Sequence, residues 1–142
     1  MKRLLLAGFI IALFLVTLTL ERESKPEQVE INSTTISVEI ADSEKERKEG
    51  LSGWEKLEKD EGMLFIFDEK DRHAIWMKDM DFSIDIIWLD EKGKVVDLKR
   101  NASPESYPNT FFPKDYSLYV LELRAGLIEK LDIELGEQIN FN

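Results

Sequence analysis

The chain has 142 residues, a length that fits a single domain. It contains 19 lysine and arginine residues against 29 aspartate and glutamate residues, and a net charge of −10 disfavours binding to nucleic-acid phosphates. The absence of cysteine excludes disulfides, thiolate zinc sites, iron–sulfur clusters and cysteine catalysis. With His73 as the one histidine, no metal and no cofactor are expected.

The N-terminal segment is long and apolar. Residues 4–20, LLLAGFIIALFLVTLTL, carry no charge, and as a helix they would extend roughly 25 Å, close to the ~30 Å core of a bilayer. The run ends without an Ala-x-Ala cleavage site, so an uncleaved transmembrane signal-anchor over residues 1–20 is favoured over a cleaved leader and a secreted domain. A buried core helix is disfavoured because the run is apolar on every face.

The flanks of that segment predict its orientation. Lys2 and Arg3 precede it, and positive charges favour the cytoplasmic side, so residues 31–142 are expected outside the cytoplasm behind a polar tether of residues 21–30. The chain after Arg3 holds 17 basic and 29 acidic residues, a net charge of −12. Anionic lipid headgroups would repel this charge, so the domain is expected to stand off the membrane.

The first part of the domain predicts a strand and two short helical segments. Apolar and polar residues alternate over residues 31–41, as in a half-buried strand. Ser43 and Glu46 form an S-x-x-E capping box, and Gly50 is placed to end a short, exposed helix. Residues 51–60 then predict one helical turn against the core.

Strands dominate the middle of the chain. Residues 63–67 form a continuous apolar run, typical of a strand buried on both faces. A charged turn over residues 68–72 and another strand over residues 73–77 are expected next. Residues 83–89 and 94–100 are joined by Asp90-Glu91-Lys92-Gly93 and predict a hairpin, whose first strand has one face made by Ile84, Ile86 and Trp88 and the other by Asp85, Ile87 and Leu89.

Residues 101–117 have no period and hold three prolines and four aromatic residues. A segment of this length is either functional, as a lid or docking surface, or folded on itself over one end of the domain. Residues 118–124 resume as a strand, Gly126 opens a short helix, and a last strand contains Ile139 and Phe141. The sum predicts a mostly β (α+β) fold, a compact antiparallel barrel-like or sandwich domain with two or three short helices.

Five segments together resemble one known family. They are Gly50-Leu51, Gly62-Met63-Leu64-Phe65, Trp76-Met77-Lys78-Asp79-Met80, Asp85-Ile86-Ile87 and Leu121-Glu122-Leu123-x-Ala125-Gly126. Their order and spacing are similar to the DUF192 family, also catalogued as UPF0127, over roughly residues 36–141. This chain has Asp79-Met80 where the family pattern usually has Asn-Thr, and Ile84 where it usually has Leu. The resemblance implies a compact β-rich fold, often behind a signal or anchor segment, and implies no particular reaction.

Two carboxylates lie between apolar neighbours in predicted strands. A carboxylate at such a position, as at Asp85 and Glu122, has to be paired, hydrogen-bonded or placed at a site. Two such groups ~5–10 Å apart could act as acid and base on a glycosidic bond. The alternative is that each faces water or pairs with a base such as Lys78, Lys99 or Arg124.

Trp76, Met77 and Lys78 combine a flat aromatic ring, an adaptable side chain and a cation, which suits an organic anion or a peptide. The alternative is a core Trp and Met at the end of a strand, with Lys78 in solvent. His73 follows the charged turn and is expected to be exposed. The candidates for ligand binding are therefore Trp76, Met77, Lys78, Asp85 and Glu122.

Two functions from different classes follow from these features. The first is a membrane-tethered extracytoplasmic binding or accessory module, with the lipid bilayer as partner of residues 4–20 and a small organic ligand, a peptide or an envelope protein as partner of the domain. The second is a small carboxylate-dependent hydrolase acting on envelope or extracellular material. A purely structural surface protein is a third interpretation, and whether the chain is an enzyme stays open.

Overall fold

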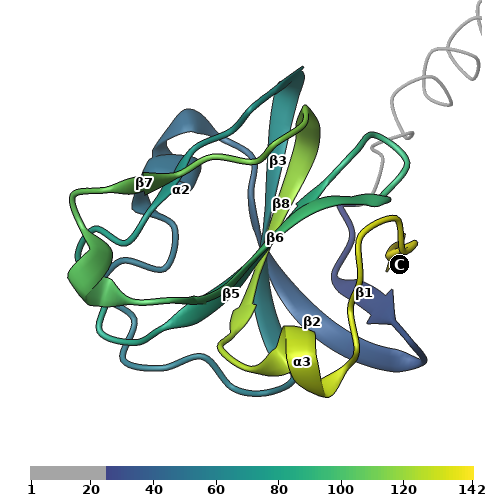
Figure 1. The fold of residues 1–142 in the computed structure, drawn as a ribbon, viewed down its shortest axis with the longest axis horizontal. Helices are drawn as coiled ribbons and strands as arrows, with labels where there is room; N and C mark the ends of the chain where they lie inside the picture. The colour runs from purple at the N-terminus through teal and green to yellow at the C-terminus, as the bar shows by residue number, and fades with distance from the viewer. Residues whose placement is uncertain (1–24) are drawn as a thin grey trace, which may run out of the picture.

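The computed structural model describes residues 25–142, so the expected membrane segment, residues 4–20, lies outside the described part. Between residues 25 and 142, no helix has the length and apolar character needed to cross a membrane. Seven strands of this region form one mixed sheet, in the order β6-β5-β8-β3-β2-β1-β9 (Figure 1). These strands are β1 (Gln28–Ile31), β2 (Thr34–Ala41), β3 (Glu61–Asp71), β5 (Ile84–Leu89), β6 (Val95–Ala102), β8 (Ser117–Arg124) and β9 (Asn140–Phe141).

Short elements cover the two sides of the sheet. On one side lie α2 (Glu44–Glu49) and a two-stranded sheet of β4 (Ile75–Trp76) and β7 (Thr110–Phe111). On the other side lies α3 (Leu127–Lys130), at the bottom of Figure 1, while β1 and the C-terminus lie at the right. A single 3-10 turn, Pro104–Ser106, precedes β7.

The sheet curls into a half-barrel, and the last segment of the chain joins its two ends. β9 pairs with β1 at one end of the sheet. Just before β9, Ile139 N donates to the carbonyl oxygen of Gly93 at 2.9 Å, and Val95 N at the start of β6 donates to that of Glu137 at 2.8 Å. These bonds enclose an inner core of leucine, isoleucine and valine side chains, to which α3 contributes Leu127 and Ile128. The prediction of a mostly β, barrel-like domain is confirmed at this level.

One pair of strands departs from the predicted antiparallel arrangement. β2 and β3 run parallel, with Ile40 beside Leu64. A parallel pair needs a crossover connection, and here α2 and residues 50–60 supply it. The predicted capping box at the start of α2 is confirmed, since Glu46 N donates to Ser43 Oγ at 3.2 Å and Ser43 N donates to the carboxylate of Glu46 at 2.9 Å.

The prediction of one strand over residues 31–41 is wrong. The chain turns back at Asn32 and Ser33, whose φ values of 47° and 64° belong to a tight hairpin turn between β1 and β2. Apolar residues keep alternating on both sides of this turn, so periodicity alone did not reveal it. β1 begins at Gln28, within residues 21–30 where the polar tether was expected.

Two other expectations fail in their details. β3 continues to Asp71, so residues 68–71 are extended rather than a charged turn, and Asp71 still pairs with Ser117 of β8 after an irregularity. Residues 51–60 form turns without a helix, although Leu57 is buried as expected. Gly53, whose φ of 77° lies in the left-handed region, interrupts any helix that would begin at Leu51.

β5 is buried along its whole length because each of its faces packs on a separate core, as the hairpin pattern predicted. Ile87 and Leu89 belong to the inner core. Ile84, Ile86 and Trp88 belong to an outer core between the sheet and the layer that contains β4 and β7. The parity of a residue along a strand therefore decides which core its side chain enters.

Gly62 allows β3 to pack closely on β8. A Cβ atom at Gly62 would lie 2.9 Å from the backbone oxygen of Glu122, a contact that real Cβ atoms essentially never make. We expect Gly62→Ala to lower the free energy of unfolding by about 1–3 kcal/mol, since the two strands have to move apart. Urea denaturation of the full-length chain measures this change, with Glu69→Ala, an exposed site on the same strand, as the control expected within about 0.5 kcal/mol of the wild type. A Gly62→Ala variant as stable as this control would contradict the close approach.

Candidate functional site

Asp85 lies on the inner face of β5 and connects three parts of the backbone. Its side chain is fully buried. Oδ1 accepts a hydrogen bond from Asn101 N at 2.9 Å, and Oδ2 accepts from Gly126 N at 3.0 Å and from Ile128 N at 2.8 Å. The carboxylate thus ties the end of β6 and the start of α3 to β5. These bonds account for a buried carboxylate without any ligand.

Glu122 lies on the opposite face of the same sheet. Ile86 of β5 pairs directly with Glu122 of β8, so these two side chains share a face, while the neighbouring Asp85 points to the other. The sheet therefore separates the two carboxyl groups. A hydrolase that uses Asp85 and Glu122 as an acid–base pair is incompatible with this arrangement, because both groups would have to flank one bond.

Glu122 is buried without a partner. Its exposed fraction is 4%. Among residues 25–142, no side chain forms an ion pair with its carboxyl group and no donor forms a hydrogen bond to it. Every fully enclosed side-chain oxygen in this region has a hydrogen-bond partner. The Glu122 oxygens have none, so they are not fully enclosed and border open space. Burial alone raises the pKa of Glu122 to about 8, because the charged form loses its hydration. At neutral pH the group is therefore mostly a neutral carboxylic acid, which can donate a hydrogen bond.

Glu122 is one of the residues that line a small pocket. The pocket has a volume of about 50 Å³ and lies between the end of α2 with the following loop and the strand β4. Four of the five segments that resemble DUF192 meet here, through Gly50, Leu51, Phe65, Trp76, Met80 and Glu122. Residues distant in the chain are thus brought to one place by the crossover through α2 and by the pairing of β3 with β8.

The predicted Trp-Met-Lys segment divides between the pocket and the core. Trp76 lines the pocket and has an exposed fraction of 40%. The Nζ atom of Lys78 lies 5.7 Å from the centroid of the Trp76 ring, within reach of a cation–π contact. Met77 is buried in the outer core, as the alternative interpretation proposed. Of the five predicted site residues, Trp76 and Glu122 line the pocket, and Lys78 lies beside Trp76. Met77 and Asp85 lie elsewhere.

The aromatic segment, residues 101–117, lies against β4. Phe111 pairs with Ile75 in the small sheet. The ring of Tyr107 meets the ring of Trp76 edge-on, with centroids 6.3 Å apart. Tyr107 and Phe112 keep exposed fractions of 43% and 56%. Sequence reasoning did not select Tyr107 as a site residue, because nothing periodic in the segment indicated which aromatic residue would reach Trp76.

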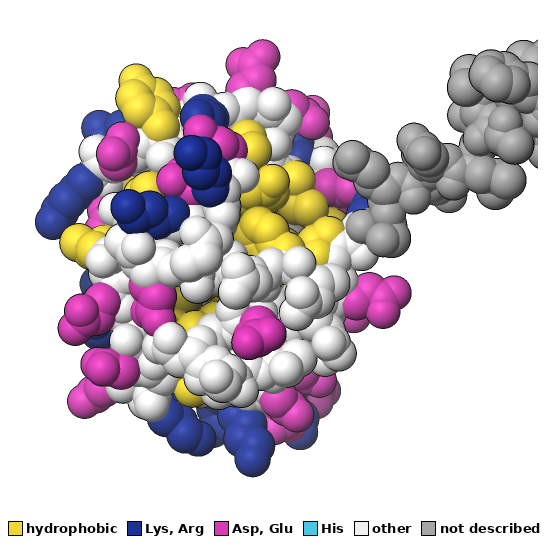
Figure 2. Space-filling view, turned by 90° about the vertical axis from the view of Figure 1, so that its right-hand side faces the viewer, with side chains coloured by type: hydrophobic (Ala, Val, Ile, Leu, Met, Phe, Trp, Pro, Cys, Tyr) yellow, Lys and Arg dark blue, Asp and Glu magenta, His cyan; other side chains and the backbone are white. Residues whose placement is uncertain are grey.

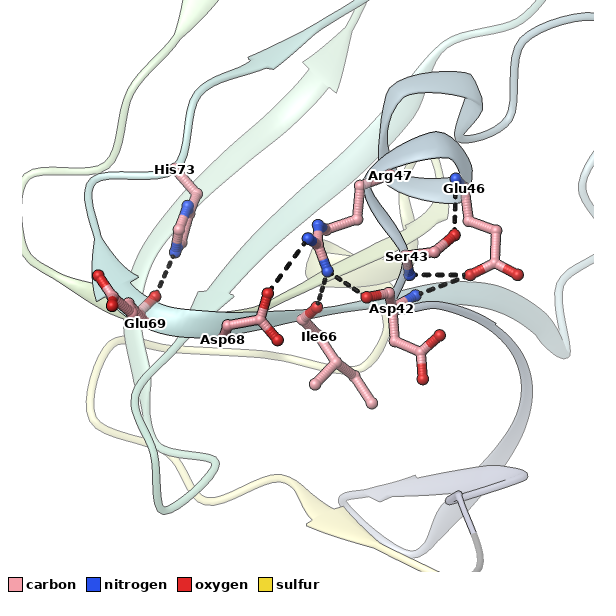
Figure 3. A network of polar contacts seen from close by, with 8 residues as sticks. All are labelled: Asp42, Ser43, Glu46, Arg47, Ile66, Asp68, Glu69 and His73. Atoms are coloured by element: carbon pink, nitrogen blue, oxygen red, sulfur yellow. Dashed lines mark hydrogen bonds and ion pairs between the residues drawn. The ribbon is translucent and has the colours of Figure 1, made fainter.

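Arg47 holds α2 on the sheet at the other side of the pocket (Figure 3). Its guanidinium donates to the carbonyl oxygens of Asp42 and Ile66, the latter at 2.7 Å, and lies 3.6 Å from the carboxylate of Asp68. It also lies 5.2 Å from the centroid of the Phe67 ring. Sequence reasoning missed Arg47, because a basic residue in a short exposed helix has no signal that separates it from its solvated neighbours.

His73 is only half-exposed and has a structural role. Its ring stacks on the ring of Phe67, with centroids 3.5 Å apart. Its Nε2 atom lies 3.0 Å from the carbonyl oxygen of Glu69, a contact drawn in Figure 3. Its own carbonyl oxygen accepts a hydrogen bond from Trp88 Nε1 at 2.8 Å. Burial lowers the pKa of His73. His73 is not among the residues that line the pocket.

Known proteins resemble the chain in sequence and in fold. A family model described as "DUF192: Uncharacterized ACR, COG1430" matches residues 27–141. A UPF0127 protein of Thermococcus gammatolerans is 34% identical over 107 residues, which are 74% of this chain and 66% of that protein. A UPF0127 protein of Thermococcus sibiricus is 37% identical over 81 residues, 56% of this chain and 50% of that protein. The matched regions thus span about half to two thirds of these relatives.

Two crystal structures share the fold. One, from Sinorhizobium meliloti 1021 and described as a candidate transcription regulator, has a TM-score of 0.75 and 27% identity, covering 80% of this chain and 90% of that one. The other, a protein of unknown function from Novosphingobium aromaticivorans DSM 12444, has a TM-score of 0.74 and 26% identity, covering 80% and 83%.

Proposed function

The chain belongs to the DUF192 family, and we propose that it is a ligand-binding module, tethered to a membrane by residues 4–20, with its domain outside the cytoplasm. The ligand site is the pocket of Glu122 and Trp76. The membrane part of this proposal rests on the charge-free N-terminal run and on the preceding Lys2 and Arg3.

The observation that carries the binding role is the unpartnered carboxyl group of Glu122. Most buried polar side chains have a hydrogen-bond partner within the protein. The oxygens of Glu122 border open space instead, and a titratable group with a raised pKa at such a place is a candidate for binding. The exposed ring of Trp76 beside the pocket adds a flat apolar surface for the rest of that ligand.

A role in binding DNA or RNA, like the regulator role named for the Sinorhizobium meliloti protein, is not favoured for this chain. Its net charge is −10, whereas binding to nucleic-acid phosphates needs a basic surface. The hydrolase alternative depended on Asp85 and Glu122 as an acid–base pair, and these two residues lie on opposite faces of the sheet.

Ligand screening by NMR tests the binding role. Small organic acids, amines and neutral amides are added in turn to the full-length chain in detergent micelles, with isotope labels on the methionine methyl groups and the tryptophan side chains. We expect at least one class to shift the signals of Met80 and Trp76, which line the pocket, and to leave the buried Trp88 unchanged. If none of the three classes shifts Met80 or Trp76, the proposed binding role is wrong.

The tether is tested by fractionation. We expect the full-length chain, expressed in a bacterial host, to stay in the membrane pellet after alkaline carbonate washing, and its domain to be digested by protease added to spheroplasts. A matched variant, Phe14→Arg, puts a charge into the apolar run at a cost of about 2.5–3.5 kcal/mol and should weaken retention. Recovery of the wild-type chain in the soluble cytosolic fraction would contradict the tether.

The net charge of the chain supports a position of the domain away from the lipid headgroups. Figure 2 shows the face that carries β1 and the C-terminus, where acidic and basic side chains together surround a group of hydrophobic ones, while the chain as a whole has a net charge of −10. Acidic groups are repelled by the negative surface potential of anionic lipids. We therefore expect the domain to make no lasting contact with anionic lipid.

A further inference from the structure

Building on the proposed function, we propose that the Glu122 pocket binds the carboxylate head of an organic ligand, with the carboxyl group of Glu122 donating a hydrogen bond to it. The shared chemistry is a carboxylate beside a short apolar group. A free organic acid and the C-terminus of a peptide both offer it.

The size of the pocket limits the ligand to a head group. A volume of about 50 Å³ is far below the ~300–1,000 Å³ of pockets that enclose a drug-sized molecule. A carboxylate with one or two carbon atoms matches a space of this order. The remainder of the ligand would lie across the exposed ring of Trp76.

The charges around the pocket favour an anion. Arg47 and Lys48 line it, and the ammonium group of Lys78 lies over Trp76. Glu49 is the acidic residue that lines the pocket besides Glu122, and its carboxylate lies 3.8 Å from the Nζ atom of Lys45. Asp68, 3.6 Å from the guanidinium, offsets part of the charge of Arg47. Lys48 and Lys78 have no ion-pair partner among residues 25–142, so this region keeps a positive balance in a chain whose overall charge is −10.

Glu122 itself is suited to donate. The residues paired with it across the sheet are Met63 and Ile86, which carry no charge. Burial raises the pKa of Glu122 to about 8, so the proton is present at neutral pH. A carboxylic acid kept neutral by its surroundings is an effective hydrogen-bond donor to an anionic oxygen, and such charge-assisted bonds are short and strong.

The test compares three probes of one shape on the full-length chain in detergent micelles: butyrate, butanamide and butylammonium. We expect butyrate to shift the Met80 and Trp76 NMR signals at pH 6.5, and its Kd to rise at least tenfold at pH 9.5, where Glu122 has lost its proton. Butylammonium should not bind, and butanamide should bind more weakly than butyrate. Acetyl-alanyl-alanine with a free C-terminus is compared with butyrate to identify the source of the carboxylate. Tighter binding of the dipeptide indicates a peptide C-terminus, and tighter binding of butyrate indicates a free organic acid.

Two variants of Glu122 test separately its titration and its ability to donate a hydrogen bond. Glu122→Gln keeps an N–H donor, so we expect it to bind butyrate with the same Kd at both pH values. Glu122→Leu removes the donor and should lose at least tenfold in affinity, while circular dichroism confirms that it is folded. Glu122→Leu binding butyrate as tightly as the wild type would overturn the inference.

The same probes distinguish a failure of the carboxylate inference from a failure of the proposed binding role. If butylammonium binds in the pocket and does so more tightly as the pH rises, the ligand is a cation and the carboxylate inference is wrong, while the binding role stands. The same holds if butanamide binds more tightly than butyrate. If no probe and no member of the wider screen shifts the pocket signals, both proposals fail.

Discussion

Raising the pH from about 5 to about 9 is expected to lower the free energy of unfolding by about 4 kcal/mol through Glu122 alone. The pKa of this group is about 8 in the folded chain and close to 4.5 in the unfolded chain. Between these values the folded state holds a proton that the unfolded state has released, so stability falls as the pH rises. The loss begins above pH 4.5 and is complete once the pH exceeds about 8.

The matched control is Glu122→Gln, which keeps the shape and removes the titration. His73 acts in the opposite direction, because its pKa is lowered in the folded state and its contribution to stability is lost as the pH falls. The difference in unfolding free energy between wild type and Glu122→Gln, measured by urea denaturation at several pH values, isolates Glu122. A difference that does not change with pH would show that the carboxyl group is hydrated, and the buried donor would then not exist.

Asp85→Ala is expected to lower the free energy of unfolding by at least about 3 kcal/mol. The substitution leaves the N–H groups of Asn101, Gly126 and Ile128 without their acceptor. An orphaned buried N–H group such as that of Ile128 costs on the order of 1–3 kcal/mol, and the part-buried bonds from Asn101 and Gly126 add smaller losses. The variant can be so unstable that it does not fold, in which case Asp85→Asn, which retains one acceptor oxygen, should show an intermediate loss.

Asp97→Ala on the neighbouring strand is the control for Asp85→Ala. The carboxylate of Asp97 also accepts backbone hydrogen bonds, from Leu98 N at 2.8 Å and Lys114 N at 2.7 Å, but water reaches this half-exposed site. We expect a loss of about 1 kcal/mol there. Equal losses at Asp85 and Asp97, measured by urea denaturation, would contradict a special structural role for Asp85.

Asp85 and Glu122 show why the sequence pattern could not distinguish a structural carboxylate from a candidate binding residue. Both are acidic residues in the middle of apolar strands, and both are buried. Asp85 meets backbone N–H groups from residues 16 to 43 positions away, whereas Glu122 meets none. The hydrogen-bond partners of each carboxylate come from other elements, and a strand pattern carries no information about them.

Local chemistry was enough to predict several elements of this protein. The capping box at Ser43, the β5–β6 hairpin around Gly93 and the short helix after Gly126 each depend on residues a few positions apart. The alternation along β5 also predicted which side chains share a face, because a strand repeats every two residues. The five scattered segments were enough for the family, which the match over residues 27–141 confirms.

Only the tertiary structure decided the parallel pairing of β2 with β3, the turn at Asn32 and the composition of the pocket. Each depends on how different segments of the chain pack together, and the hydrophobic effect is non-directional, so an apolar pattern does not say which segment will cover it. Periodicity assigned a residue to a face of its strand, but the neighbours on that face came from the crossover through α2. For this reason Glu122 and Asp85 could be named from the sequence as buried carboxylates, while their different surroundings required the folded chain.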